Sequence, residues 1–258
     1  MAYENELKAV VDAAQEAGII IKENYGNVDF ELKKDNSFVS EVDRKAEDLI
    51  KSRLKQAFAE YGFIGEETGD SSSDSEYVWV VDPLDGTTNY KMKNPFFNVS
   101  IALAKDGVPV LGVVYHPIVG DLFTAISGEG ATLNGEKIMI GEEPEAHAGI
   151  HAYCFGKDKD DLETVGKIYS RLLSEGYKLR QIGAAALELA SVGAQRVNSF
   201  FMVGVNPWDV AAGQLIASEA GARVTDFDGN PFSIKSSSIL VAPEKLHEEL
   251  KLRLAKIL

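Results

Sequence analysis

Two aspartates, Asp82 and Asp85, lie three positions apart in the segment Asp-Pro-Leu-Asp-Gly-Thr-Thr-Asn, which begins at Asp82. Carboxylates this close repel each other unless a cation lies between them, and hard divalent ions such as Mg²⁺ prefer oxygen ligands. Gly86, Thr87 and Thr88 follow directly, and their backbone N–H groups and hydroxyls can hold an anion at the start of a helix. The segment therefore predicts a metal site beside a phosphate site.

The apolar run 77–81 before this segment is typical of a buried strand, so both aspartates fall where the strand ends and the chain turns. A turn that only caps a strand is the simpler alternative. A second pattern favours the metal site: Asn206 suits an N-cap, Pro207 the first helical position and Asp209 the first turn of a helix. A first-turn aspartate can act on the helix dipole alone, but here it could supply a third metal-binding carboxylate.

The residues after Asp209 and those before the first motif add to this picture. Ala212, Ile216 and Ala220 recur at intervals of four and predict a packing face, which Gly221 ends. The segment 63–68 reads Phe-Ile-Gly-Glu-Glu-Thr, a short apolar strand that ends in paired glutamates, and residues 69–75 are predicted to form a solvated loop. Alone, the glutamates would be interpreted as surface charge.

In this order the three segments resemble the inositol monophosphatase family of Mg²⁺-dependent, lithium-sensitive phosphatases. That family carries Gly-Glu-Glu, then Trp-x-x-Asp-Pro-x-Asp-Gly-Thr-x-Asn, then Trp-Asp-x-Ala-Ala-Gly leading into Glu-Ala-Gly. The resemblance extends over nearly the whole chain, as far as residues 221–226. It implies an α/β (α+β) fold, a layered α-β-α-β-α sandwich, with the metal site between two halves and a homodimeric assembly.

The resemblance also implies ligands for two or three Mg²⁺ ions. The implied ligands are Glu66, Asp82, the backbone carbonyl of Leu84, Asp85 and Asp209. One bound ion would lower the pKa of a water and another would offset the charge of the leaving oxygen, with attack in line on phosphorus. Positioning and charge neutralisation would then supply most of the rate, without a phosphoenzyme.

Other residues receive their roles from the same resemblance. Glu66 and Thr87 are implied to orient the attacking water, and Asp43 to hold the hydroxyl of Thr87. The residues implied to contact the substrate or its phosphate are Asp85, Gly86, Thr87, Ala185 and Asp209. Lys33 lies in a polar segment, 33–40, that matches a lysine-bearing loop of the family, although a plain solvated lysine is an equal alternative.

The substrate remains open at this level. Inositol phosphatases typically carry a glutamate that binds inositol hydroxyls where this chain has Met202. Strict inositol specificity is therefore in doubt, and fructose 1,6-bisphosphate or a 3′(2′),5′-bisphosphate nucleotide are alternative substrates. Tyr153, Arg180 and Arg196 could contact a second phosphate or remain structural. A non-catalytic regulatory member of the fold is the alternative of another class, which the intact set of implied ligands disfavours.

Composition limits the partners. The chain has 258 residues and a formal net charge of −14, which argues against nucleic acid or an anionic membrane as partner and favours a small phosphate ester. The single cysteine, Cys154, allows no intrachain disulfide and no cysteine-based metal cluster. With no charged-then-apolar leader and no apolar run of about 18 residues, a cytoplasmic enzyme is expected.

The periodicity predicts two halves with a soft boundary, 1–145 and 146–258. In the first half it predicts helices over 4–25 and 41–60 and antiparallel strands over 97–105, 108–116 and 121–126. After Pro144 it predicts alternating elements typical of an α/β half. These are strands over 149–154, 178–182, 199–203 and 238–242, and helices over 159–175, 184–195 and 208–220.

Overall fold

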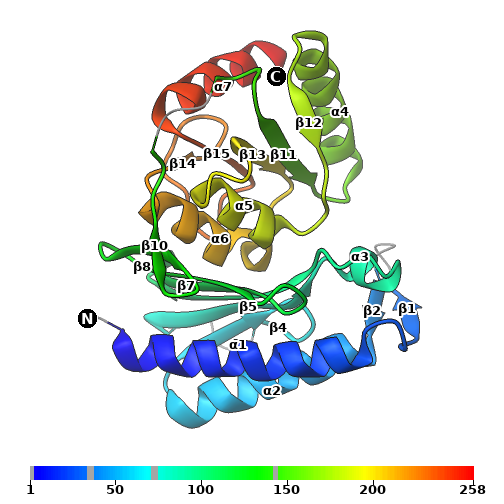
Figure 1. The fold of residues 1–258 in the computed structure, drawn as a ribbon, viewed down its shortest axis with the longest axis vertical. Helices are drawn as coiled ribbons and strands as arrows, with labels where there is room; N and C mark the ends of the chain where they lie inside the picture. Colours follow the sequence, from blue (N-terminus) through cyan, green and yellow to red (C-terminus); the bar gives the residue numbers. More distant parts are fainter. Residues whose placement is uncertain (1–2, 34–37, 71–74, 142–144) are drawn as a thin grey trace.

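The computed structural model describes residues 3–33, 38–70, 75–141 and 145–258. Helices and sheets alternate in it as five layers (Figure 1). From one side to the other these are α1 (Glu4–Asn24) with α2 (Glu41–Ala57), an eight-stranded sheet, α5 (Ala185–Gly193) with α6 (Pro207–Glu219), a five-stranded sheet, and α4 (Lys159–Ser174) with α7 (Glu244–Ile257). The predicted α-β-α-β-α sandwich is confirmed.

The eight-stranded sheet is the larger of the two. Its order is β10 (Glu136–Ile138), β9 (Gly130–Leu133), β8 (Asp121–Ile126), β7 (Val108–His116), β6 (Asn98–Lys105), β5 (Tyr77–Asp85), β3 (Gly62–Gly65) and β4 (Gly69–Asp70). Among the described strands of this sheet, only β3 and β5 pair in parallel. Because helices cover both faces of the sheet, β5 and β6 are buried almost throughout, which explains their continuous apolar sequences.

The five-stranded sheet belongs to the second half of the chain. Its order is β12 (Lys178–Arg180), β11 (Ile150–Phe155), β13 (Ser199–Val203), β15 (Ser238–Ala242) and β14 (Arg223–Thr225). β11 pairs in parallel with β12 and β13, and the other pairs are antiparallel. No strand pairing between described residues crosses position 145, so we propose to keep the division near that residue.

Helices α2 and α6 begin in different ways. Ser40 caps α2 with a capping box, in which its hydroxyl faces the N–H of Asp43 and the Asp43 carboxylate accepts the N–H of Ser40. α6 begins with Pro207 at its first position, as predicted. Asn206, however, makes no side-chain bond to the helix backbone, because its amide donates to the Asp209 carboxylate at 3.0 Å.

Two segments expected to be loops are partly ordered as strands. Residues Phe38–Ser40 form β2, which pairs with β1 (Phe30–Leu32) beside the short helix α3 (Thr87–Lys91), and residues 34–37 lie outside the described part. Gly69–Asp70 form β4 at the edge of the large sheet, and residues 71–74 again lie outside the description. Backbone pairing with a neighbouring strand outweighs the polar composition of these segments.

No helix of the described chain is both long and apolar enough to cross a membrane.

Candidate active site

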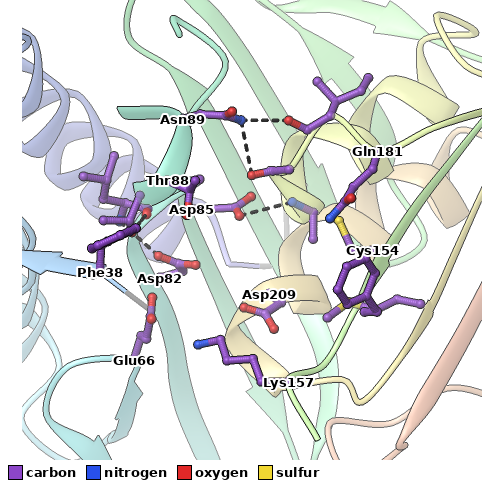
Figure 2. Close-up of a pocket in the computed structure, with 18 residues that line it drawn as sticks. Phe38, Glu66, Asp82, Asp85, Thr88, Asn89, Cys154, Lys157, Gln181 and Asp209 are labelled. Atoms are coloured by element: carbon purple, nitrogen blue, oxygen red, sulfur yellow. Dashed lines mark hydrogen bonds between the residues drawn. The ribbon is translucent and has the colours of Figure 1, made fainter. Parts of the chain in front are cut away.

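The four predicted carboxylates face one cavity of about 480 Å³. Figure 2 shows Glu66, Asp82, Asp85 and Asp209 turned towards the same space, from separate parts of the fold. Residues of the second half, among them Met202 and the segment 181–183, line the opposite wall. The cavity therefore lies where the two halves of the chain meet.

The end of β5 sets the positions of the first two aspartates. The pairing of β5 with β6 shifts register between Asp82 and Asp85, and such an irregularity turns the side chains of a strand out of simple alternation. Glu66 follows β3 directly, and its N–H donates to the carbonyl of Val81 at 3.1 Å, so it lies beside the same strand. Asp209 reaches the cavity from the first turn of α6.

Negative charge accumulates in this cavity. Burial raises the pKa of Asp82 well above its ordinary value, and the neighbouring charges of Glu66, Asp85 and Asp209 raise it further. The pKa of Asp209 is raised to about 7, first by burial and then by Glu66 and Asp85. A cation placed among these carboxylates would offset the repulsion that adds to the effect of burial.

Asp85 is held by donors from both halves of the chain. Asn98 Nδ2 donates to Asp85 Oδ2 at 2.7 Å, and the backbone N–H groups of Ala185 and Ala186 donate to Oδ1 and Oδ2 at 3.1 and 2.9 Å. These bonds lower the pKa of Asp85, but burial outweighs them and raises it to about 6. The carboxylate is thus oriented before any ligand binds, and the N–H group of Ala185 already has a partner.

Thr87 occupies the position implied for orienting water. Its hydroxyl lies 3.3 Å from Asp43 Oδ1 and 3.1 Å from the carbonyl oxygen of Leu84. Asp43 is buried, which raises its pKa, although bonds from Ser40 act in the opposite direction. Gly86, which precedes Thr87, has a φ of 93° and allows the backbone to turn sharply between Asp85 and α3.

Lys33 neutralises part of the acidic wall. Its ammonium lies 3.0 Å from Glu66 Oε1 and 2.6 Å from Glu67 Oε1. Although burial lowers the pKa of Lys33, the charge of Glu66 and the hydrogen bonds to both glutamates raise it above its ordinary value. The lysine is therefore part of the site rather than a solvated surface charge.

The donor set fits Mg²⁺ in its chemistry. Among the described residues, no three His, Cys, Asp or Glu side chains form a group that could hold a metal ion by themselves. Mg²⁺ needs no such cage, since it is usually bound by one or two carboxylates, with water and phosphate oxygens completing its shell. The clustered carboxylates, together with the Leu84 carbonyl that accepts the Thr87 hydroxyl, provide oxygen atoms of the kind that Mg²⁺ prefers.

A second cavity of about 500 Å³ adjoins the first. Five residues line both cavities: Glu66, Phe155, Lys157, Met202 and Asp209. Met202 is buried and presents an apolar surface at this junction, and Figure 2 shows the ammonium of Lys157 at the edge of the acidic wall. The sequence pattern did not indicate Phe155 or Lys157, because Phe155 ends β11 and Lys157 follows it in a segment without a recognisable motif.

Three of the candidate substrate residues line neither cavity. Tyr153 stacks on Phe201 with ring centroids 5.6 Å apart, because it points to the opposite face of β11 from Cys154, which does line the first cavity. Arg180 lies exposed on the edge strand β12 and donates to the carbonyl of Leu179 at 2.7 Å. These positions favour the structural alternative for both residues. Arg196 is likewise structural, since it pairs with Asp121 at 2.5 Å.

Sequence and structure comparisons agree with this geometry. The model of the inositol monophosphatase family matches residues 2–257. Inositol monophosphatase 1 of Solanum lycopersicum is 39% identical over 255 residues, which cover 96% of this chain and 93% of that protein. Nus factor SuhB of Escherichia coli (strain K12) is 40% identical over 228 residues, covering 86% and 85%.

A solved structure is similar over its full length. The crystal structure of extragenic suppressor protein suhB from Bartonella henselae superposes with a TM-score of 0.92 at 35% identity, covering 99% of this chain and 100% of that one. Members of the matched family are phosphomonoesterases that bind phosphate esters and typically use Mg²⁺. The chain described here belongs to the inositol monophosphatase family.

Proposed function

We propose that this protein is a Mg²⁺-dependent phosphomonoesterase that hydrolyses inositol 1-phosphate and related sugar phosphates. The observation that supports it most is the convergence of Glu66, Asp82, Asp85 and Asp209 on one cavity beside the hydroxyl of Thr87. Such a cluster is costly for a protein unless cations bind there, since burial and mutual repulsion act against its charge.

The residues of the first cavity and Asp43 divide the chemical roles among them. Glu66 and Thr87 orient the attacking water, and Asp43 holds the Thr87 hydroxyl. The N–H groups of Gly86 and Thr87 bind phosphate oxygens. Two or three Mg²⁺ ions, held by the carboxylates and the Leu84 carbonyl, would supply a water of lowered pKa and offset the charge of the leaving oxygen.

The alcohol part of the substrate extends towards Met202 and the second cavity. Asp85, Asp209 and Ala185 lie on this path, although the N–H of Ala185 is engaged by Asp85. An apolar side chain at position 202 offers no hydrogen bond to a polyol, so we propose a broad preference among phosphomonoesters. Fructose 1,6-bisphosphate is the second candidate substrate, because the Lys157 ammonium at the junction of the two cavities could attract its other phosphate.

Release of inorganic phosphate tests the proposal. Inositol 1-phosphate, fructose 1,6-bisphosphate and adenosine 3′,5′-bisphosphate are each incubated with the protein in Mg²⁺, in EDTA, and in EDTA followed by excess Mg²⁺. The proposal predicts release from the first two substrates, loss in EDTA and recovery on adding Mg²⁺. Absence of release from all three would favour the non-catalytic alternative. That alternative is considered because some relatives are named Nus factor SuhB.

The proposed assembly is a homodimer that acts on a small-molecule ester. This follows from the family resemblance and is tested by light scattering of the purified protein, where a monomeric mass at micromolar concentration would contradict it.

A further inference from the structure

Glu188 is a fully buried carboxylate that the proposed reaction does not use. It lies in the first turn of α5 with none of its surface exposed. Its Oε1 accepts the backbone N–H of Ile182 at 2.8 Å and that of Gly183 at 2.6 Å. Burial raises the pKa of Glu188 to about 8, and no salt bridge of the described residues involves it.

The loop that Glu188 holds is connected directly to the acidic wall. Asn89 Nδ2 donates to the carbonyl of Ile182 at 2.8 Å, as Figure 2 shows, and so ties the loop to the helix that follows Asp85. Directly after this loop, the N–H groups of Ala185 and Ala186 at the start of α5 are the donors that orient the Asp85 carboxylate. A shift of the loop would therefore turn Asp85.

Glu47 does the same on the other side of the cavity. It is fully buried in α2, and its two oxygens accept the N–H groups of Glu67 and Thr68 at 2.9 and 2.8 Å. The carboxylate packs against the backbone of Gly65, where an added Cβ would come within 2.6 Å of it. It thus holds the chain on both sides of Glu66, another of the four carboxylates.

We propose that Glu47 and Glu188 are positioning residues for the metal site, one in each half of the chain, and this inference rests on the proposed function. Two buried carboxylates without ion partners in the described residues are costly to fold. Each accepts backbone N–H groups from a loop that carries or orients a proposed ligand, and the outer partners of metal ligands typically control affinity. Glu47 fixes Glu66, and Glu188 fixes Asp85 through residues 182–186.

The bonding pattern predicts opposite results for the same substitution. A glutamine keeps one acceptor oxygen and replaces the other by a donating amide. Glu188 uses a single oxygen for both N–H groups, so Glu188→Gln retains both bonds, and its amide would face the Cys154 sulfur, which lies 3.7 Å from Oε2. Glu47 uses both oxygens, so Glu47→Gln sets an amide donor against a backbone N–H.

Calorimetric titration with Mg²⁺ alone tests the inference. Glu47→Gln and Glu188→Leu should weaken Mg²⁺ binding by about 10- to 100-fold, whereas Glu188→Gln should retain the affinity that Glu188→Leu loses. Glu249→Gln is the matched control, because Glu249 accepts a hydrogen bond from Tyr177 at 2.6 Å and lines neither cavity. Circular dichroism and thermal melting establish that each titrated variant is folded.

The outcomes distinguish a failure of the positioning role from a failure of the proposed function. If Glu47→Gln melts at a lower temperature but binds Mg²⁺ like the wild type, these glutamates are only structural and the inference is overturned. If Glu188→Leu does not fold, the contrast between Glu47→Gln and Glu188→Gln decides, and equal affinities would overturn it. A wild type that binds no Mg²⁺ contradicts the proposed function instead.

Discussion

The hydroxyl of Thr87 lies 3.3 Å from a carboxylate oxygen of Asp43, which is buried in the first turn of α2. The capping box with Ser40 fixes Asp43, so its free acceptor can direct the hydroxyl proton of Thr87 inwards. The oxygen lone pairs of Thr87 are then available to a water in the cavity. This pair connects helix capping, a local feature, with the proposed orientation of the nucleophile.

Replacing Thr87 should therefore affect turnover more than substrate binding. Thr87→Ala removes the group that orients the water, and kcat should fall by about 10²-fold or more, with a much smaller change in KM. Thr87→Ser keeps the hydroxyl and should retain most of kcat. Steady-state kinetics with inositol 1-phosphate measure both constants, and an unchanged kcat for Thr87→Ala would remove Thr87 from the mechanism.

Gly86 should tolerate no side chain. Its φ of 93° is strained for any other residue, and an added Cβ would lie 3.1 Å from the carbonyl oxygen of Phe96 and 3.2 Å from Ala184 Cβ. Gly86→Ala should reduce the free energy of unfolding by roughly 2–4 kcal/mol. Gly120→Ala is the control, since Gly120 has a φ of 85° but nothing within 4 Å of the added Cβ.

Urea unfolding of the two variants separates strain from collision. In both variants the left-handed backbone should lower the free energy of unfolding by roughly 1–2 kcal/mol. The collision should lower it further in Gly86→Ala. Equal losses would mean that the loop around Ala184 moves aside without cost.

The raised pKa of Asp209 predicts how the metal-free protein responds to pH. A carboxyl group whose folded-state pKa, here about 7, exceeds its ordinary value of 3.8 binds protons more tightly when folded. Its contribution to stability is therefore complete below about pH 4 and is lost as the pH rises through 7. In EDTA, Asp209→Asn should thus melt several degrees higher than the wild type at pH 8 and nearly with it at pH 4.

Mg²⁺ should reverse that order. At pH 8 the bound ion stabilises the charged carboxylates of the wild type, which raises its melting temperature. In Asp209→Asn the ion lacks one ligand, so the variant gains less. Differential scanning calorimetry at both pH values, with EDTA or Mg²⁺, gives the four comparisons. A variant that melts below the wild type at pH 8 in EDTA would show that Asp209 carries no electrostatic strain.

Met202 should set the breadth of the substrate range. A glutamate at this position could accept hydrogen bonds from polyol hydroxyls. Each hydrogen bond to a charged group contributes roughly 1.5–3 kcal/mol. Met202→Glu should therefore shift the ratio of kcat/KM towards inositol 1-phosphate over fructose 1,6-bisphosphate by about 10- to 100-fold. Met202→Leu, which keeps the site apolar, should leave the ratio near that of the wild type. A wild type that prefers inositol 1-phosphate a thousandfold would contradict this account of Met202.

Local patterns predicted the parts of the fold and site that depend on local physics. The continuous apolar sequence of β5 indicated a strand buried on both faces, and Pro207 indicated the first residue of α6. The spacing of Asp82 and Asp85 at a strand end indicated a metal site, and all four implied carboxylates do face one cavity. These features need only neighbours in sequence, or a motif that keeps its order.

Features that depend on topology could not be predicted in this way. The bonds from Ala185 and Ala186 to Asp85 join residues about a hundred positions apart, and they form only because α5 packs between the two sheets. No motif singles out Glu188, and its burial and its bonds to residues 182 and 183 become visible only in the fold. For Tyr153 both a substrate contact and a structural role stayed open, because neighbouring residues of β11 face opposite sides of the sheet and the sequence alone does not say which side is the cavity.

Phosphate release by the wild type and by Asp82→Asn, at matched Mg²⁺ concentrations, tests the central claim most directly. Asp82 is buried among the clustered carboxylates, and asparagine preserves its size while removing the charge that a cation needs. The wild type should release phosphate from inositol 1-phosphate only with Mg²⁺, and the folded variant should be slower by at least about 10²-fold. Full turnover by the wild type in excess EDTA, or by Asp82→Asn in Mg²⁺, would contradict a metal-dependent phosphatase at this site.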